Sequence, residues 1–391
     1  MRHPLRLVIA ILGLLYTLSL SHGLPHRFVP DDSAVKCALH IAADLADGES
    51  PLPLIQRAVP PAGSYTTYPY LLPYLDLVAI GVRYAAGRLV GEWSSAAAFR
   101  EVLFEDASLA WLPARWVTVL LALLLPLALS RATRELGRGR VEAALAALLG
   151  GSSLLVVQYV HTSRPWAPLV ALVALTLAAS LRLRRRGGRQ DVALAFVCAG
   201  LAAAVHPAGL VAFGLPVLAG MIYRLPFSKL LLGASAGGLI CALVGYPYLL
   251  VYGRDAAVGA LMSPSVAGSI QLGGQAFSFD LLGGGQAATV IHSWIGYDPV
   301  LLCLGFGAFF GFRKTWGKSW WLVAFPCIAW TALFLSYDGA HVRYFIPAVP
   351  FLAIGAGPAL AFLMRAGKAS QILALGLLAF PLVQAARLDQ L

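Results

Sequence analysis

Eleven apolar stretches recur along the 391 residues of the chain, and most are long enough to cross a bilayer as a helix. A hydrocarbon core of about 30 Å needs roughly 20 apolar residues in helical form. Only 12% of the residues are charged and 59% are hydrophobic, whereas soluble domains are about a quarter charged. The chain is therefore predicted to be an all-α polytopic membrane protein with about 11 transmembrane helices. The stretches cover 5–22, 112–130, 141–160, 165–181, 190–206, 208–223, 229–251, 296–312, 319–336, 344–364 and 369–386.

The stretch 69–91 is apolar as well, but Asp76, Arg83 and Arg88 interrupt it. If it lies on the membrane surface, one set of loops holds 18 of the 29 basic residues and only three of the 18 acidic ones. If it crosses the membrane, 16 of those 18 basic residues fall on the side opposite the two arginines of the N-terminus. Because basic residues gather in cytoplasmic loops, we predict a surface-lying helix at 69–91 and cytoplasmic basic loops. The net charge of +11 is thus explained by the excess of basic residues in the predicted cytoplasmic loops, and no nucleic-acid partner is predicted.

The predicted organisation follows from these spans. The first stretch also fits a cleaved signal peptide, but ten further stretches follow it, so we expect it to remain as the first transmembrane helix. Five cysteines are scattered singly, without a CxxC or Cys/His cluster, so neither a metal site nor a disulfide framework is indicated. We predict a first transmembrane helix at 1–22, an extracytoplasmic loop with juxtamembrane helices at 23–111, transmembrane helices 2–7 at 112–251, a second extracytoplasmic loop at 252–295, and transmembrane helices 8–11 at 296–391.

Two adjacent carboxylates, Asp31 and Asp32, follow the first stretch, and an amphipathic helix is predicted directly after them at 33–46. Ionisable groups close to the membrane are costly and usually functional. An aspartate in this position also caps a helix N-terminus. The two roles are compatible, because a cap uses one carboxylate and leaves the other available for chemistry.

A second polar group, His341 and Arg343, lies at the outer mouth of a predicted span, on the same side as Asp31. The guanidinium of an arginine there can bind a phosphate through two parallel hydrogen bonds, and a neighbouring histidine can assist. The alternative is an arginine that extends its side chain to the lipid headgroups.

A third group of aromatic and polar residues marks the outer turn between the third and fourth spans. Such residues can stack on and hydrogen-bond sugars, although an interfacial aromatic belt has the same composition. Tyr68 and the tyrosines near it carry the same two interpretations, His206 is expected in a turn, and His292 is a lone histidine in the second loop. The turn contains Tyr159, His161, Ser163, Arg164 and Trp166.

The order of these motifs resembles a known family. The first span is followed by Pro30-Asp31-Asp32 and a helix, and Tyr68-Pro69-Tyr70-Leu71-Leu72 heads the surface helix. Trp111-Leu112-Pro113-Ala114-Arg115 opens the next span, and His341, Arg343-Tyr344 and Pro347 are similar to an "RYxxP" element near the C-terminus. Over residues 1–365 the set resembles the polytopic glycosyltransferases of the C superfamily, in particular the protein O-mannosyltransferase and aminoarabinose-transferase branch.

The resemblance implies transfer of a sugar from a polyprenyl-phosphate donor, outside the cytoplasm, to an acceptor hydroxyl on a protein or a glycolipid. It implies a multi-pass protein of the cell (inner) membrane, an inverting reaction, and no cofactor beyond the lipid-linked substrate. Asp31 would be the general base with Asp32 beside it, and Arg343 would bind the donor phosphate with His341. The resemblance, together with where these residues stand relative to the predicted spans, suggests five further substrate contacts: Tyr68, His161, Arg164, Tyr344 and His292.

One departure from the family pattern stands out. Many relatives carry an acid in the turn after the third span, where this chain has Trp166. The tryptophan argues against a second carboxylate or a bound metal there, and it is compatible with a divergent acceptor or lost activity. Two other classes therefore stay open, a transporter or flippase of lipid-linked sugars and an inactive scaffold. The span centres are nearly free of charge and show no internal repeat, which favours surface chemistry over transport.

Overall fold

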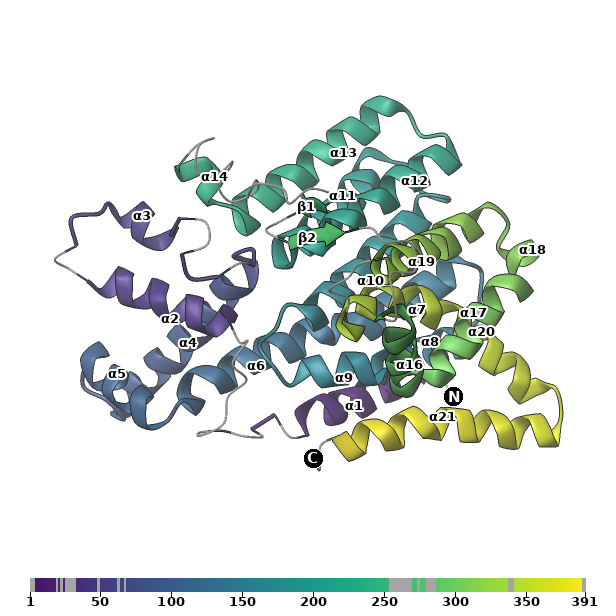
Figure 1. Ribbon diagram of the computed structural model, residues 1–391, viewed down its shortest axis with the longest axis horizontal. Helices are drawn as coiled ribbons and strands as arrows, with labels where there is room; N and C mark the ends of the chain where they lie inside the picture. The colour runs from purple at the N-terminus through teal and green to yellow at the C-terminus, as the bar shows by residue number, and fades with distance from the viewer. Residues whose placement is uncertain are drawn as a thin grey trace.

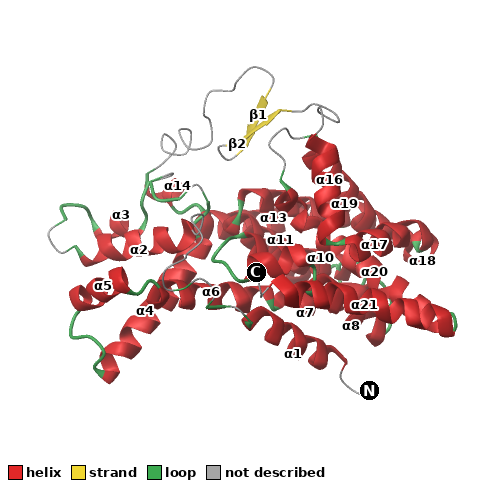
Figure 2. Ribbon diagram, turned by 60° about the horizontal axis from the view of Figure 1, so that its bottom comes forward, coloured by secondary structure: helices red, strands yellow, loops and turns green. Residues whose placement is uncertain are grey.

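The computed structural model describes residues 4–18, 20, 21, 24, 33–47, 50–61, 64–66, 68–252, 269–272, 275–278, 286–336 and 341–388. These residues are almost entirely helical, as predicted. The exception is a short antiparallel pair, β1 (Ser269–Leu272) and β2 (Gln275–Ser278), in which Ser269 pairs with Ser278. The pair stands apart from the helices in Figure 2, within the predicted second loop.

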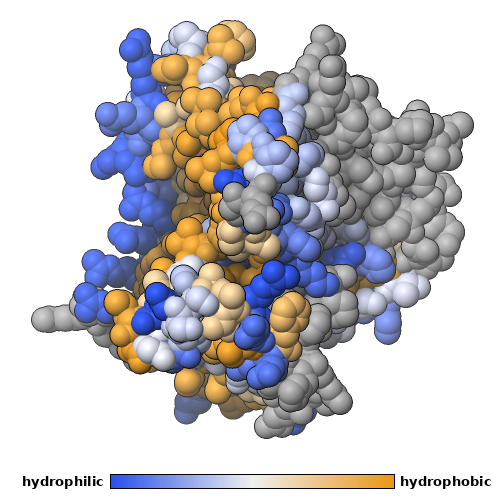
Figure 3. All heavy atoms as spheres, turned by 90° about the vertical axis from the view of Figure 1, so that its left-hand side faces the viewer, coloured by the Kyte–Doolittle hydropathy of each residue, from blue (hydrophilic) through white to orange (hydrophobic). Residues whose placement is uncertain are grey.

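The end of the molecule at the left of Figure 1 includes the helices that follow the first predicted span. They are α2 (Ser33–Ala46), α3 (Leu54–Ala58), α4 (Leu71–Val90) and α5 (Ala96–Glu105). The helix predicted at 33–46 is therefore confirmed, and the ambiguous stretch 69–91 forms helix α4. Figure 3 looks onto this end, where hydrophilic and hydrophobic residues are interspersed, as expected of helices that lie at a membrane surface.

The remaining helices run mainly along the long axis of the molecule (Figure 1). Each of the eleven predicted stretches overlaps at least one of them. They are α1 (Pro4–Thr17), α6 (Ser108–Ala122), α7 (Leu124–Glu135), α8 (Arg140–Gly151), α9 (Leu154–Val160), α10 (Trp166–Arg182), α11 (Arg189–Val205), η1 (Pro207–Phe213), α12 (Gly214–Tyr223), α13 (Phe227–Ile240), η2 (Cys241–Gly245), α14 (Tyr248–Val251), α16 (Gln286–Tyr297), α17 (Pro299–Gly311), α18 (Arg313–Trp316), η3 (Gly317–Ser319), α19 (Trp320–Leu335), η4 (Val342–Ala348), α20 (Val349–Arg365) and α21 (Lys368–Leu388).

Among the described residues, five helices are long and apolar enough to cross a membrane, and seven if each of two bent pairs counts as one span. The bent pairs are α8 with α9, at 60°, and α16 with α17, at 103°. Three further apolar helices are shorter, and α4 is not among the candidate spans. The chain is thus a multi-pass membrane protein, and the count of eleven spans stays a prediction.

The second bent pair begins inside the segment predicted as the second extracytoplasmic loop, because residues 286–297 form helix α16. His292 consequently lies on a helix and not in a loop. The bend falls at Asp298, directly before Pro299, which occupies the first turn of α17. Proline has no backbone N–H to donate and is tolerated in the first turn of a helix, so a new helix axis can start there.

Helix α20 lies at the centre of the packing. All ten residues from Val349 to Pro358 are buried, as expected of a helix that is apolar on every face.

Tyrosines join the left-hand end of the molecule to the helix bundle. The backbone N–H of Tyr70 donates to the carbonyl of Gly245 over 2.9 Å, and the Tyr252 hydroxyl donates to the carbonyl of Val59 over 2.9 Å. Burial raises the pKa of Tyr74 to about 12, so its hydroxyl stays protonated and donates to Ala58.

The predicted cytoplasmic loops lie together at the opposite end, at the right of Figure 1. Each of four contacts joins two of these loops or the helix ends beside them, which the predicted topology places on the same side of the membrane. The contacts are Arg185 to Glu135 (4.0 Å), Arg138 Nη2 to Thr315 Oγ1 (2.9 Å), Arg365 to Glu142 (3.1 Å) and Lys229 Nζ to the Gly187 carbonyl (2.8 Å).

This grouping leads to a topology prediction. In a variant without the exposed Cys303, a cysteine at position 292 should react with a membrane-impermeant maleimide added to intact cells. A cysteine at position 138 should react only after the cells are opened, because basic loops are retained in the cytoplasm. Strong labelling at position 138 of intact cells with none at position 292 would contradict the orientation.

Helices α11 and α13 approach so closely that glycine is required at their contact. A Cβ atom at Gly237 would collide with the backbone carbonyl of Phe196, and one at Gly200 would collide with the carbonyl of Gly237. A Cβ at the adjacent Gly238 would meet nothing within 4 Å. Small residues at such contacts are what lets membrane helices pack.

The two neighbouring glycines provide a matched test. We expect Gly237→Ala to lower the free energy of unfolding by about 1–3 kcal/mol, because the helices must separate to admit a methyl group. Gly238→Ala should leave stability unchanged or raise it slightly, because alanine favours helix and the site is open. Thermal unfolding of the purified variants in detergent measures both, and equal melting temperatures would refute the close contact.

Candidate functional site

A cavity of about 280 Å³ opens where the predicted outer mouth of span 342–365 meets two short helices. Arg343 and His341 contribute one wall, at the start of η4. Tyr159, near the end of α9, and side chains of α16 contribute the others. The lining residues are Tyr159, Thr289, Val290, Ser293, His341, Val342 and Arg343. The structure therefore brings the predicted pair His341 and Arg343 together in one cavity.

The guanidinium of Arg343 is half-buried and lies 5.6 Å from the ring centroid of Tyr344. It is close enough for its positive charge to act on Tyr68, Tyr159 and His206 as well. Among the described residues, its Nε has no hydrogen-bond partner. A cation in this setting is available to an anionic ligand, since a guanidinium binds phosphate oxygens through two donors.

Aromatic rings form a continuous layer beside Arg343. The ring centroid of Trp166 lies 4.3 Å from that of His206 and 5.4 Å from that of Tyr344, and the Trp166 and Tyr344 rings meet edge to face. The ring centroid of Tyr68 lies 5.3 Å from that of His206. These rings come from α10, η4 and the segments before α4 and η1, so that residues distant in sequence form a single cluster. Trp166, His206 and Tyr344 are buried and Tyr68 is partly exposed, so the cluster packs beside Arg343 and does not itself offer an open stacking surface.

Trp166, found where the resemblance leads us to expect an acid, is only 2% exposed. Its ring packs inward and cannot replace a carboxylate. The acid that reaches this turn is Asp76 of α4, whose carboxylate accepts a hydrogen bond from Ser163 over 2.6 Å. In the sequence, Asp76 marks only an interruption of an apolar stretch. Its position at the turn depends on how α4 docks against the membrane helices.

The other predicted contacts divide into two groups. Tyr68 and Tyr344 belong to the aromatic layer, and the guanidinium of Arg164 lies 5.9 Å from the Tyr159 ring centroid. His161 lies away from the cavity, with its Nε2 3.4 Å from the carbonyl of Leu15 on α1. His292 is exposed on α16 and does not line the cavity. Asp31 and Asp32 lie outside the described residues, directly before α2.

Two polar residues of the cavity, Thr289 and Ser293, escape analysis of the sequence. Tyr159 belongs to the turn already named as a possible sugar contact or aromatic belt, and His206, which resembles a turn residue, packs near Arg343 without lining the cavity. Thr289 and Ser293 are four residues apart, so they share one face of α16. That spacing is informative only if the segment is helical, and its glycine-rich surroundings indicate a loop instead.

No three His, Cys, Asp or Glu side chains of the described part of the chain converge as metal ligands would. The polar groups that line the cavity are a guanidinium, an imidazole and three hydroxyls, a set suited to an anion. A cation plus hydroxyl donors can hold a phosphate and stabilise charge that develops on it when it leaves.

Solved structures of ArnT and of an archaeal oligosaccharyltransferase have the same fold. ArnT from Cupriavidus metallidurans in the apo state matches with a TM-score of 0.61 and 18% identity, over 95% of this chain and 61% of that chain. ArnT bound to undecaprenyl phosphate matches with a TM-score of 0.60 and 17% identity, over 95% and 62%. The oligosaccharyltransferase AglB from Archaeoglobus fulgidus, in complex with an inhibitory peptide and a dolichol-phosphate, matches with a TM-score of 0.54 and 14% identity, over 98% and 56%.

The chain therefore has the fold of the C-superfamily glycosyltransferases, as the motif order suggests. It spans about three-fifths of the length of the ArnT structures. No family model matches the chain, and no curated protein matches it.

Proposed function

We propose that the protein is a membrane glycosyltransferase that moves a sugar from a polyprenyl-phosphate donor to an acceptor hydroxyl. The reaction takes place on the extracytoplasmic face of the cell (inner) membrane and inverts the anomeric centre. The acceptor is a hydroxyl of a protein or a glycolipid. A transporter of lipid-linked sugars and an inactive scaffold are the competing functions.

The observation that carries the proposal is Arg343 in a cavity at the mouth of a span, beside an aromatic layer. A lipid-linked sugar phosphate has three parts, an anionic phosphate, a sugar ring and an apolar chain. The cavity has the Arg343 cation for the first, and the ring of Tyr159 with the hydroxyls of Thr289 and Ser293 for the second. The bilayer outside the mouth of the span would hold the third. In one ArnT structure undecaprenyl phosphate is bound, and a ligand of the same class suits the chemistry of this cavity.

The proposed reaction assigns two complementary roles. Asp31 removes the proton of the acceptor hydroxyl, and the freed oxygen attacks the anomeric carbon. The bond between that carbon and the phosphate oxygen breaks, and its electron pair leaves with polyprenyl phosphate. Arg343 stabilises the charge that develops on this leaving group. A single displacement with one base produces inversion.

The test uses membranes that contain the protein and a polyprenyl-phosphate sugar labelled in the lipid. Release of labelled polyprenyl phosphate, lost in matched membranes with Arg343→Ala, is the expected result. Translocation of the intact lipid-linked sugar without release would instead show a flippase. Neither release nor translocation, in membranes that contain folded protein and native acceptors, would indicate a scaffold.

A further inference from the structure

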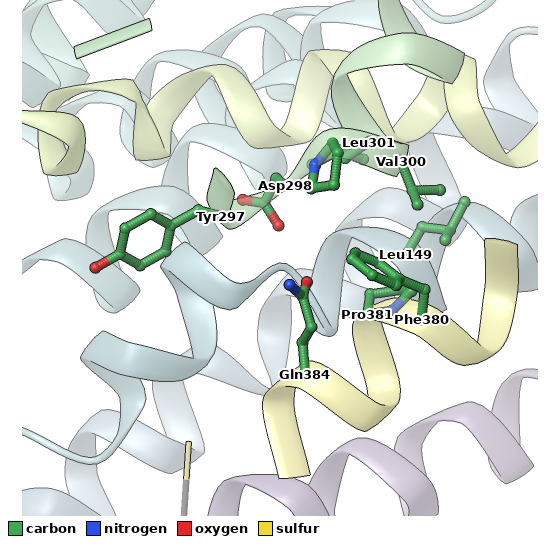
Figure 4. A pocket seen from close by; sticks show the side chains of 9 residues that line it. Leu149, Tyr297, Asp298, Val300, Leu301, Phe380, Pro381 and Gln384 are labelled. Carbon is green, nitrogen blue, oxygen red and sulfur yellow. The ribbon is translucent and has the colours of Figure 1, made fainter. Parts of the chain in front are cut away.

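A buried carboxylate outside the cavity holds the first end of the short helix α9. Asp298 is only 4% exposed, and its two oxygens accept hydrogen bonds from the Ser153 hydroxyl over 2.7 Å and from the Leu154 N–H over 2.9 Å. Ser153 precedes α9, and Leu154 is its first residue. Figure 4 shows Asp298 and Gln384 of α21 directed toward each other across a small cavity of about 10 Å³.

A second buried carboxylate contacts the turn at the other end of α9. Asp76 of α4 is fully buried and accepts a hydrogen bond from the Ser163 hydroxyl over 2.6 Å. Ser163 lies three residues beyond the end of α9 and directly before Arg164. The segment 153–163 is thus held at both ends by an aspartate–serine hydrogen bond, and the two aspartates are more than 200 residues apart.

These hydrogen bonds lie beside a short helix and at helix bends, where hydrogen bonds within the backbone do least to fix the position of the chain. A helix of seven residues, such as α9, is too short to be stable alone, and it starts at the 60° bend after α8. Asp298 lies at the 103° bend between α16 and α17. Burying a carboxylate is costly unless its hydrogen bonds are made, so the two aspartates strongly favour one arrangement of the bent helices.

The arrangement they favour is that of the cavity walls. Tyr159 is on α9, between Ser153 and Ser163, and Thr289 and Ser293 are on α16, which ends directly before Asp298. One carboxylate therefore ties two walls of the Arg343 cavity to each other. The other ties the turn that carries Arg164 to the surface helix α4.

We propose that Asp298 and Asp76 are positioning residues, whose hydrogen bonds to Ser153 and Ser163 set the place of Tyr159 relative to α16 and Arg343. The consequence for catalysis rests on the proposed glycosyltransferase function. The geometric part does not, because it concerns the distance between two helices.

The geometry is tested with spin labels on two exposed positions, Gln158 of α9 and His292 of α16, each changed to cysteine in the full-length protein lacking Cys303. Electron–electron double resonance then measures the distance between the helices. We expect Asp298→Ala to shift or broaden the distance distribution. Asp298→Asn should preserve it, because the amide oxygen accepts from Leu154 and the amide N–H donates to the Ser153 oxygen.

Milder variants keep the test decisive if Asp298→Ala does not fold. Ser153→Ala and Ser163→Ala each remove a single hydrogen bond and should broaden the distribution less. Thr133→Val is the matched control, because it removes a buried hydrogen bond of 2.8 Å to Leu129 on α7, at the basic end of the molecule. It should lower thermal stability without altering the distance. Unchanged distributions in the Asp298→Ala or Ser153→Ala protein would overturn the proposal.

The kinetic consequence is read separately, from release of polyprenyl phosphate. Asp298→Ala should raise KM for the donor at least about tenfold through misplacement of the cavity wall, with restoration in Asp298→Asn and no change in Thr133→Val. If the wild-type protein releases nothing, the proposed function fails while the spin-label result still decides the geometry. Wild-type kinetics in Asp298→Ala, together with a shifted distance, would show that the hydrogen bond does not serve the donor site.

Discussion

Sugar transfer should fall by about 10²–10⁴-fold in kcat when Asp31 is replaced by asparagine, because general-base catalysis contributes that much. Asparagine has nearly the same shape and can still cap α2, so the protein should fold. It cannot accept a proton at neutral pH. Donor affinity should change little, since the donor phosphate is assigned to Arg343. Single-turnover measurement of the chemical step with labelled donor is the appropriate assay.

Asp32→Asn is the matched control for this variant. If Asp32 mainly caps α2, its replacement should cost much less than that of Asp31. A comparable loss would mean that the two carboxylates act as a unit. Equal single-turnover rates for Asp31→Asn and the wild-type protein would remove Asp31 from the mechanism. The transporter and scaffold functions would then be favoured, because Trp166 supplies no base in the neighbouring turn and Asp76 is buried.

Arg343→Lys should weaken donor use although the positive charge is kept. Lysine is a point charge and cannot present the planar pair of donors that holds two phosphate oxygens. A lost hydrogen bond to a charged group corresponds to about a tenfold effect or more, so we expect an increase of that order in KM for the donor. Arg343→Ala should be more severe, because the leaving phosphate then loses the guanidinium that lines the cavity.

Arg138→Lys is the control for a general effect of arginine replacement. Arg138 lies at the opposite end, where its guanidinium is 4.3 Å from the Phe312 ring and donates to Thr315. Its replacement should leave donor KM unchanged. If Arg343→Lys also retains wild-type KM and rate, Arg343 serves as an interfacial anchor for α20 and not as a phosphate ligand.

The helices of the bundle could be predicted because each depends on a local property of the sequence. Apolar stretches form helices in a bilayer because the backbone polar groups must be satisfied within the segment. The helix after Asp32 could be placed for a similar reason, from its amphipathic pattern and its potential cap. The bend at Asp298 was missed, because the glycine-rich composition before it hides the helix that Pro299 separates from α17.

The candidate site could be predicted only in part. His341 and Arg343 are two residues apart in sequence and mark the mouth of a span, so a local motif identifies them. Tyr159 lies in a turn that the sequence offers both as a sugar contact and as an aromatic belt, and Thr289 and Ser293 belong to no motif. Their place beside Arg343 appears only when three elements meet. His292 shows the opposite outcome. The sequence suggested it as a substrate contact, but it is exposed on α16 and does not line the cavity.

Hydropathy and charge distribution thus determine that this chain is a multi-pass helical membrane protein, because each span responds to the bilayer on its own. Which side chains surround Arg343 was decided by the tertiary structure. Two bent helices meet there, and their relative position depends on hydrogen bonds between residues as far apart as Ser153 and Asp298. Such contacts form only after the spans have packed, since a buried carboxylate is stable only where its donors are already in place.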